Sequence, residues 1–227
     1  MIFHKIANKL RYWLHPSEME REHRRWLRDQ GEEKLRFSYP LDSSSLCLDV
    51  GGFQGDWCHL ARQGFDCRVE VFEPMPAFTE MLKARFATDA KVAIHPFGLG
   101  GRSRTVTISN RGDASSVLQG GEGQAISIRS VSEIFDLRGY ARVDLLKINI
   151  EGAEYELLED LLASPHMSKV RYLQVQFHDF VPNASSRMQA IRDRLGNTHV
   201  CDWHYRFVWE SWRLRTDPAP VRRQSPA

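Results

Sequence analysis

The sequence predicts an α/β fold with a mostly parallel, doubly wound sheet, a C-terminal antiparallel hairpin and an N-terminal helical extension. From Ser45 onward, short apolar runs alternate with segments of helical character, as in a parallel sheet covered by helices on both faces. Two late β-like runs follow one another without a helix between them, which indicates an antiparallel pair at the sheet edge. The length of 227 residues suits one domain of ordinary size.

The composition excludes several classes of protein. Hydrophobic residues make up 42% and charged residues 26% of the chain, as in globular rather than disordered proteins. The 31 Lys and Arg residues against 29 Asp and Glu leave a formal charge of +2, which is too balanced for a nucleic-acid binder. No apolar run approaches the ~18–20 residues that span a bilayer, and the first residues lack the apolar core of a secretory signal.

The cysteines point to a reducing compartment. They form no CxxC pair and no Cys/His cluster with zinc spacing, so we expect reduced thiols at Cys47, Cys58, Cys67 and Cys201. Together with the absence of a transmembrane segment, this predicts a soluble, cytoplasmic protein.

Residues 1–40 are predicted to form the helical extension. Apolar residues recur at helical spacing over 2–14, with lysines among them. The favoured interpretation is a helix that packs on the domain or on a partner, and the alternative is a basic amphipathic helix on a membrane surface. A second, charged helix is expected over 18–35, with Trp26 and Leu27 as its anchors.

The domain is expected to extend over residues 41–215, and the Pro-rich residues 216–227 are expected to form a disordered tail. Strands are predicted at 45–50, 68–73, 91–96, 104–109, 125–129, 143–150, 171–178, 199–203 and 206–214. Helices are predicted at 54–64, 77–87, 130–137, 153–163 and 184–195. The runs 104–109 and 125–129 alternate like an exposed hairpin pair.

A glycine-rich turn follows the first predicted strand. The sequence DVGGFQG (residues 49–55) leads from strand to helix, and glycines without Cβ atoms let a ligand approach the backbone. Glu73 follows 22 positions after Gly51, at the end of the second predicted strand, where a carboxylate can accept both ribose hydroxyls. Two nucleoside ligands fit this pattern, a dinucleotide and S-adenosylmethionine.

Three details favour S-adenosylmethionine. The glycines are spaced GGxxG rather than GxGxxG. Asp49 lies directly before them, where it would repel a pyrophosphate but not a cationic methionine amine or sulfonium. The terminal antiparallel hairpin also differs from a regular dinucleotide-binding fold.

Five motifs then follow one another in order over about residues 45–180: LDVGGFQGDW, VEVFEP, HPFGLGGRSRTVTIS, GDASSVL and VDLLKINIEGAEYELLEDL. This series resembles the FkbM-type S-adenosylmethionine-dependent methyltransferases, and it is far more specific than any one motif. The resemblance implies a Rossmann-like class I methyltransferase fold. It also implies methyl transfer to a hydroxyl of a sugar, polysaccharide or natural product.

By the same resemblance, Asp49 and the glycine turn would line the methionine end of the cofactor, Glu73 would hold the ribose, and the residues after the third strand would lie beside the adenine. The expected cofactor-binding residues are Asp49, Gly51, Gly52, Gly55, Glu73, Phe97, Gly98 and Leu99.

The sequence departs from the family at Asn149, where many members carry an Asp. Metal-dependent O-methyltransferases use a carboxylate at this strand end, and an amide is a weaker ligand for a hard cation. A divalent metal is therefore not favoured, although Glu151 keeps one carboxylate nearby.

Polar side chains alternate along two predicted strands that should be apolar on both faces. Lys147, Asn149 and Glu151 share one face by the two-residue period, and His178 ends the next strand. Ligands of such sheets bind beyond the carboxyl ends of the strands, so Asn149, Glu151 and His178 are expected near the transferred methyl group. Lys147 is expected to pair with Glu151 or Glu154.

Methyl transfer to a sugar hydroxyl benefits from a general base. His178 is the first candidate and Glu151 the second, with Asp179 placed to orient the imidazole ring. His204 is a reserve base.

Two further segments have alternative interpretations. Ser115 and Ser116 match a serine-containing family motif and lie either over the substrate pocket or in a hydrogen-bonded turn. The C-terminal aromatic run is expected to pack as an edge hairpin, with one or two rings reaching the substrate. Its members are Trp203, Tyr205, Phe207, Trp209 and Trp212.

The sequence therefore predicts an S-adenosylmethionine-dependent O-methyltransferase whose acceptor is a sugar, a polysaccharide or a glycosylated metabolite. A non-catalytic assembly protein with the same fold is the alternative, and a nicotinamide-dependent oxidoreductase is the less favoured one.

Overall fold

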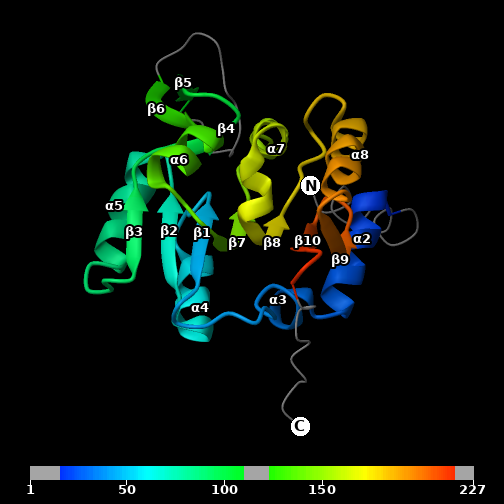
Figure 1. The fold of residues 1–227 in the computed structure, drawn as a ribbon. Helices are drawn as coiled ribbons and strands as arrows, with labels where there is room; N and C mark the ends of the chain where they lie inside the picture. Colours follow the sequence, from blue (N-terminus) through cyan, green and yellow to red (C-terminus); the bar gives the residue numbers. More distant parts are fainter. Residues whose placement is uncertain (1–15, 110–122, 218–227) are drawn as a thin grey trace, which may run out of the picture.

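The computed structural model describes residues 16–109 and 123–217. A seven-stranded sheet with the order β3-β2-β1-β7-β8-β10-β9 forms the centre of the domain (Figure 1). Neighbouring strands from β3 to β8 run parallel, and β10 is antiparallel to both β8 and β9. Its strands are β1 (Leu46–Val50), β2 (Arg68–Phe72), β3 (Val92–His95), β7 (Val143–Ile148), β8 (Val170–Val175), β9 (His199–Tyr205) and β10 (Trp209–Leu214). The predicted fold class, with its C-terminal hairpin, is confirmed.

Helices cover both faces of this sheet. On one face lie α4 (Asp56–Phe65), α5 (Pro76–Arg85) and the segment 37–41; on the other lie α6 (Val131–Arg138), α7 (Glu154–Ala163) and α8 (Ala184–Leu195). A short 3-10 helix, η1 (Pro165–Lys169), leads into β8. Every residue of β7 is buried, as expected for a central parallel strand.

A second, three-stranded sheet follows β3. It consists of β4 (Gly98–Gly100), β5 (Arg104–Ser109) and β6 (Gly123–Ser130), in the order β4-β6-β5. The predicted pairing of β5 with β6 is confirmed as antiparallel. The parallel strand β4 was not predicted, because its glycine-rich sequence carries no strand signal.

The N-terminal extension packs on the C-terminal hairpin. The expected single helix is divided into α2 (Glu18–Arg28) and α3 (Gly31–Lys34), because Gln30 adopts a left-handed conformation with φ of +52°. Trp26 is only 4% exposed and lies against the rings of Trp203 and Tyr205. The prediction that Leu27 is an anchor was wrong, since it is 60% exposed.

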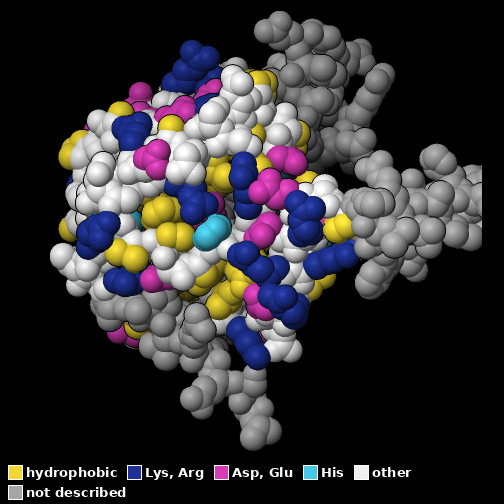
Figure 2. All heavy atoms as spheres, turned by 90° about the vertical axis from the view of Figure 1, so that its right-hand side faces the viewer, with side chains coloured by type: hydrophobic (Ala, Val, Ile, Leu, Met, Phe, Trp, Pro, Cys, Tyr) yellow, Lys and Arg dark blue, Asp and Glu magenta, His cyan; other side chains and the backbone are white. Residues whose placement is uncertain are grey.

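Charged contacts complete this interface. Figure 2 shows that Lys and Arg side chains are interspersed with Asp and Glu side chains on this edge of the molecule. Arg206 pairs with Glu18 at 3.3 Å, and Arg25 donates a hydrogen bond to the carbonyl of His204. Four of the five hairpin aromatics pack in the interior as expected, since Tyr205, Phe207, Trp209 and Trp212 are each at most 9% exposed, whereas Trp203 is half-buried.

Some predictions fall outside the described residues, namely the helix over 2–14, both serines of the GDASSVL motif (Ser115 and Ser116) and the tail beyond residue 217. Asp217 still contacts the domain through an ion pair of 2.8 Å with Arg171. Within the two described ranges, no helix combines the length and apolarity that a membrane span requires.

Candidate functional site

The strand order reverses between β1 and β7, and the turns that follow these two strands meet there. The backbone amide of Asn149 donates a hydrogen bond to the Val50 carbonyl at 3.1 Å. Gly51 has φ of +85°, and a Cβ atom at this position would lie 2.0 Å from the Asn149 carbonyl oxygen. Only glycine permits this approach. The predicted glycine turn and Asn149 therefore lie together at the reversal point, where open α/β sheets bind their ligands.

Asp49 and Lys147 form a buried ion pair directly behind the glycine turn. The Lys147 Nζ donates to Asp49 Oδ1 and to the Gly51 carbonyl, both at 2.8 Å. The prediction that Lys147 pairs with Glu151 or Glu154 was wrong. Lys147 is the register neighbour of Asp49 and shares its sheet face, whereas α7, which begins at Glu154, covers the opposite face.

One oxygen of the Asp49 carboxylate has no partner in the described residues. Burial raises the pKa of Asp49, and the cations of Lys147 and Arg36 oppose this rise. Its Oδ2 atom is buried and has no hydrogen-bond partner among the described residues. Such an orphaned acceptor is costly unless a donor reaches it.

Glu73 links the turns after β1 and β2. It is 5% exposed, and its two oxygens accept hydrogen bonds from the backbone amides of Phe53 and Met75, both at 2.9 Å. Burial raises the pKa of Glu73 above its ordinary value, and these two hydrogen bonds offset only part of the rise. Each carboxylate oxygen has a further lone pair, so Glu73 can still accept hydroxyl donors.

These features together fit a nucleoside ligand with a cationic end. The glycine turn provides room for close approach, Asp49 Oδ2 is an unused acceptor, and Glu73 stands at the end of β2, where ribose hydroxyls are bound in such folds. Phe53 adopts a left-handed conformation with φ of +48° in the same turn, and strained residues of this kind cluster at functional sites.

His178 and Glu154 form a second feature of the site. The His178 Nδ1 atom lies 2.8 Å from Glu154 Oε1, and Nε2 lies 3.5 Å from Glu151 Oε2. Glu154 is fully buried and also accepts the backbone amides of Ile150 and Gly152. The expectation that Asp179 orients the imidazole was wrong, because Glu154 performs this role.

The reason lies in where the strands end. β7 stops at Ile148 and β8 at Val175, so the two-residue alternation does not continue to Glu151 or His178. Glu151 lies instead in a turn with φ of +51°. The turn leads into α7, whose first residue is Glu154, and this brings the buried carboxylate to the imidazole. The sequence did contain a hint of this role: Glu154 is a second acidic residue after Glu151, and it lies at the start of the helix predicted over 153–163.

The surroundings of His178 favour its protonated form. Burial lowers the pKa of His178, but the hydrogen bond and charge of Glu154, with the charges of Glu151 and Asp179, raise it by more, so the pKa lies above its ordinary value. An imidazole oriented by a carboxylate through Nδ1 can accept a proton at Nε2.

The other predicted residues are placed as follows. Gly98 and Leu99 belong to β4 and are both buried, whereas Phe97 is half-buried, with its ring 5.7 Å from that of Phe72. His204 lies on β9, the edge strand, and is not brought to the carboxyl end of β7.

No metal site is evident in the ranges 16–109 and 123–217, where no three His, Cys, Asp or Glu side chains are grouped to hold an ion. The side-chain oxygen of Asn149 is buried without a hydrogen-bond partner in this part of the chain.

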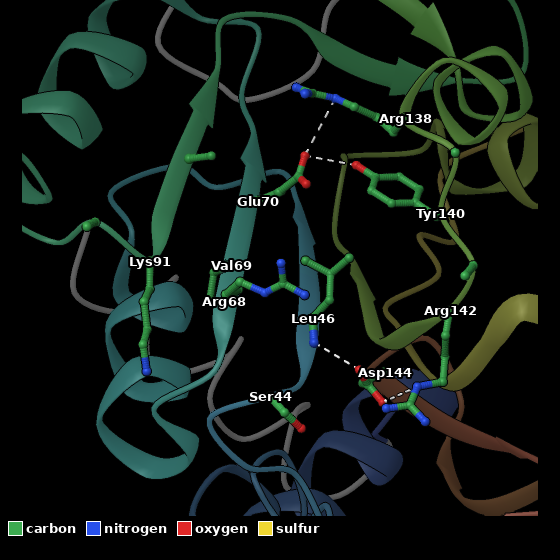
Figure 3. A pocket seen from close by; sticks show the side chains of 14 residues that line it. Ser44, Leu46, Arg68, Val69, Glu70, Lys91, Arg138, Tyr140, Arg142 and Asp144 are labelled. Carbon is green, nitrogen blue, oxygen red and sulfur yellow. Dashed lines mark hydrogen bonds and ion pairs between the residues drawn. The ribbon is translucent and has the colours of Figure 1, made fainter.

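A cavity of about 510 Å³ lies at the opposite end of the strands (Figure 3). Its carboxylates already have partners, because Glu70 accepts from the Tyr140 hydroxyl at 2.8 Å and Asp144 pairs with Arg142 at 3.0 Å. Arg68 lies across its middle in Figure 3. The cavity borders the amino-terminal ends of β1, β2 and β7, and is therefore separate from the glycine turn.

Known proteins resemble this chain in sequence and in fold. The model of a family described as the methyltransferase FkbM domain matches residues 49–207. No curated protein gives a significant match. A putative rRNA-methylase from Clostridium thermocellum has a similar structure, with a TM-score of 0.50 and 7% identity over 84% of this chain and 94% of that chain.

Two solved structures with S-adenosyl-homocysteine are also similar. TrmK of M. capricolum has a TM-score of 0.45 and 10% identity, covering 79% of this chain and 66% of that chain. The N-methyltransferase NodS from Bradyrhizobium japonicum has a TM-score of 0.43 and 10% identity, covering 83% and 87%.

Proposed function

The chain belongs to the FkbM methyltransferase family and is an S-adenosylmethionine-dependent methyltransferase, and from this premise we propose that it methylates a hydroxyl of a sugar, a polysaccharide or a glycosylated metabolite. The observation that carries the proposal is the His178–Glu154 pair beyond the carboxyl end of β8. A sugar hydroxyl is a weak acid, and this pair is suited to remove its proton.

The cofactor-binding residues follow from the site. Asp49 and the glycine turn of Gly51, Gly52 and Gly55 would hold the methionine end, and Glu73 would accept the ribose hydroxyls. The backbone after β3, at 97–99, would lie beside the adenine. The cofactor supplies a methyl group activated by a sulfonium, so the protein has to align the acceptor and remove one proton.

His178 is the proposed base. In the neutral imidazole that donates from Nδ1 to the Glu154 carboxylate, Nε2 carries the lone pair and lies on the other side of the ring from that carboxylate. The acceptor hydroxyl would lose its proton to Nε2 as its oxygen bonds to the methyl carbon, and the bond from that carbon to the sulfonium sulfur would break, with S-adenosylhomocysteine as the leaving group. The buried Glu154 then stabilises the imidazolium.

Glu151 is the second candidate for the base. Its carboxylate is half exposed and lies 3.5 Å from His178 Nε2, so it reaches the same space as an incoming hydroxyl. Asn149, on the preceding turn, has an unused amide oxygen that can accept a hydrogen bond from the acceptor.

The test is a transfer assay with methyl-labelled S-adenosylmethionine against monosaccharides, oligosaccharides and glycosylated small molecules. Retention of label at a sugar oxygen supports the proposal, and label on a nitrogen or carbon of the acceptor contradicts it. Once an acceptor is found, His178→Ala should lower turnover and leave S-adenosylhomocysteine affinity nearly intact. Unchanged turnover would exclude His178 and assign the base to Glu151.

A further inference from the structure

A row of buried polar side chains crosses the main sheet behind the glycine turn. Asp49, Lys147, Gln174 and Ser211 are register neighbours on β1, β7, β8 and β10, and each is at most 4% exposed. The interior of a parallel sheet is normally apolar, and buried polar groups are costly unless they have partners.

The N-terminal extension supplies partners for this row. Arg36 Nε donates to Gln174 Oε1 at 3.1 Å, and Gln174 Nε2 donates back to the Arg36 carbonyl at 2.9 Å. Tyr39 accepts a second hydrogen bond from Gln174 Nε2 at 3.1 Å, and its hydroxyl lies 2.9 Å from Ser211 Oγ. The segment just after α3 is thus hydrogen-bonded to two central strands.

Arg36 is also a second cation whose charge lowers the pKa of Asp49. Its side chain is 11% exposed, pairs with Glu32 at 2.6 Å and lies over the Trp209 ring at 4.1 Å. The guanidinium is therefore held in one place. Asp49 has 0% exposure, with Lys147 on Oδ1 and no partner on Oδ2 in the described residues.

We propose that Arg36 is a positioning residue of the cofactor site. It anchors the extension to Gln174, which lies one strand away from Lys147. Its cation also helps to hold the Asp49 carboxylate ready for the methionine ammonium. The inference rests on the proposed placement of that ammonium at Asp49. It assigns the segment after α3 to the cofactor-binding part of the enzyme, although this segment lies outside the predicted domain and outside the glycine turn.

The charge on Asp49 depends on groups from several elements. Lys147 of β7 and Arg36 favour the carboxylate. Glu73 after β2 and the Cys58 thiol of α4 also interact electrostatically with Asp49. Loss of the Arg36 cation therefore raises the pKa of Asp49 further. As the solution is acidified, Asp49 of the variant then becomes protonated at a higher pH than in the wild type, and binding of a cationic ligand weakens at that higher pH.

The experiment is calorimetric titration of the full chain with S-adenosylhomocysteine from about pH 5 to about pH 8. In Arg36→Met, the affinity should fall roughly tenfold or more, and the acid limb of the affinity profile should move to higher pH. Arg36→Lys keeps the cation and should leave that limb in place. The matched control is Arg28→Met, which removes an exposed arginine of the same extension that pairs with its neighbour Asp29.

The outcomes are distinguishable. An unchanged affinity and pH profile in a folded Arg36→Met protein would overturn the inference, even if its melting temperature falls. Should Arg36→Met not fold, a shifted acid limb in Arg36→Lys would contradict it. Failure of the wild-type protein to bind S-adenosylhomocysteine would instead overturn the placement of the cofactor.

Discussion

The imidazole of His178 and the carboxylate of Glu154 lie 2.8 Å apart, and the carboxylate is completely buried. Glu154 reaches this position from the first residue of α7, where its oxygens also accept two backbone amides of the preceding turn. A carboxylate held in this way cannot swing away from the ring, so the orientation and charge of the imidazole depend on it.

Replacing Glu154 by Gln should lower turnover about 10²-fold, because the amide cannot stabilise an imidazolium. The base must be neutral to act, so activity of the wild-type protein should decline as the pH falls through the raised pKa of His178. Without the Glu154 charge this pKa drops, and the acid limb of the kcat/KM profile should move to lower pH. The control is Glu156→Gln, which removes a half-exposed carboxylate of the same helix that pairs with Arg104. An acid limb that stays in place in Glu154→Gln would exclude the coupling.

Glu73→Gln should weaken S-adenosylhomocysteine binding roughly 10- to 100-fold, since charge-assisted hydrogen bonds to two hydroxyls become neutral ones. Calorimetry measures the change directly. Glu80→Gln, which alters only an exposed ion pair with Lys83, should bind like the wild type. Equal affinity in Glu73→Gln would mean that the ribose is bound elsewhere.

Two glycine variants separate steric conflict from backbone strain. Gly51 and Gly139 both have positive φ, but a Cβ at Gly51 would lie 2.0 Å from a carbonyl oxygen, whereas at Gly139 it would meet nothing within 4 Å. Gly139→Ala should cost about 1 kcal/mol of unfolding free energy, through strain alone. Gly51→Ala should cost more and should abolish S-adenosylhomocysteine binding. Urea unfolding and calorimetry together check both expectations, which fail if the two variants behave alike.

Trp26→Ala should reduce the free energy of unfolding by about 3–5 kcal/mol, because this ring is buried between Trp203 and Tyr205. The adjacent Leu27→Ala should have little effect, since that side chain is 60% exposed. Thermal unfolding of both variants provides the comparison. A small loss in Trp26→Ala would show that the extension contributes little to the fold.

The alternation of apolar runs and helices was sufficient to predict the main sheet, since buried parallel strands such as β7 are nearly continuous in apolar residues. It could not predict β4, whose short sequence Gly98–Gly100 has no periodicity, or the break at Gln30, which lies within a continuous charged pattern. Both depend on tertiary packing rather than on local propensity.

The site shows the same division. The glycine turn, Glu73 and His178 could be proposed as site residues from residue type and spacing. Their partners could not, because pairing depends on strand register and on where each strand ends: Lys147 meets Asp49 across the sheet, and Glu154 rather than Asp179 meets His178. Such contacts between distant parts of a chain have no local signature in one sequence.

The packing of α2 against the β9–β10 hairpin also orders the assembly of the chain during synthesis. The contact between Arg25 and His204 joins positions 179 residues apart. α2 is therefore translated before β9 and β10, and it finds its docking surface only after these two strands have been made. Because β10 inserts between β8 and β9 but follows both of them in the chain, the sheet is completed only when β10 has been made. Until then β8 is an unpaired edge, and the nascent protein is open to chaperones and to aggregation.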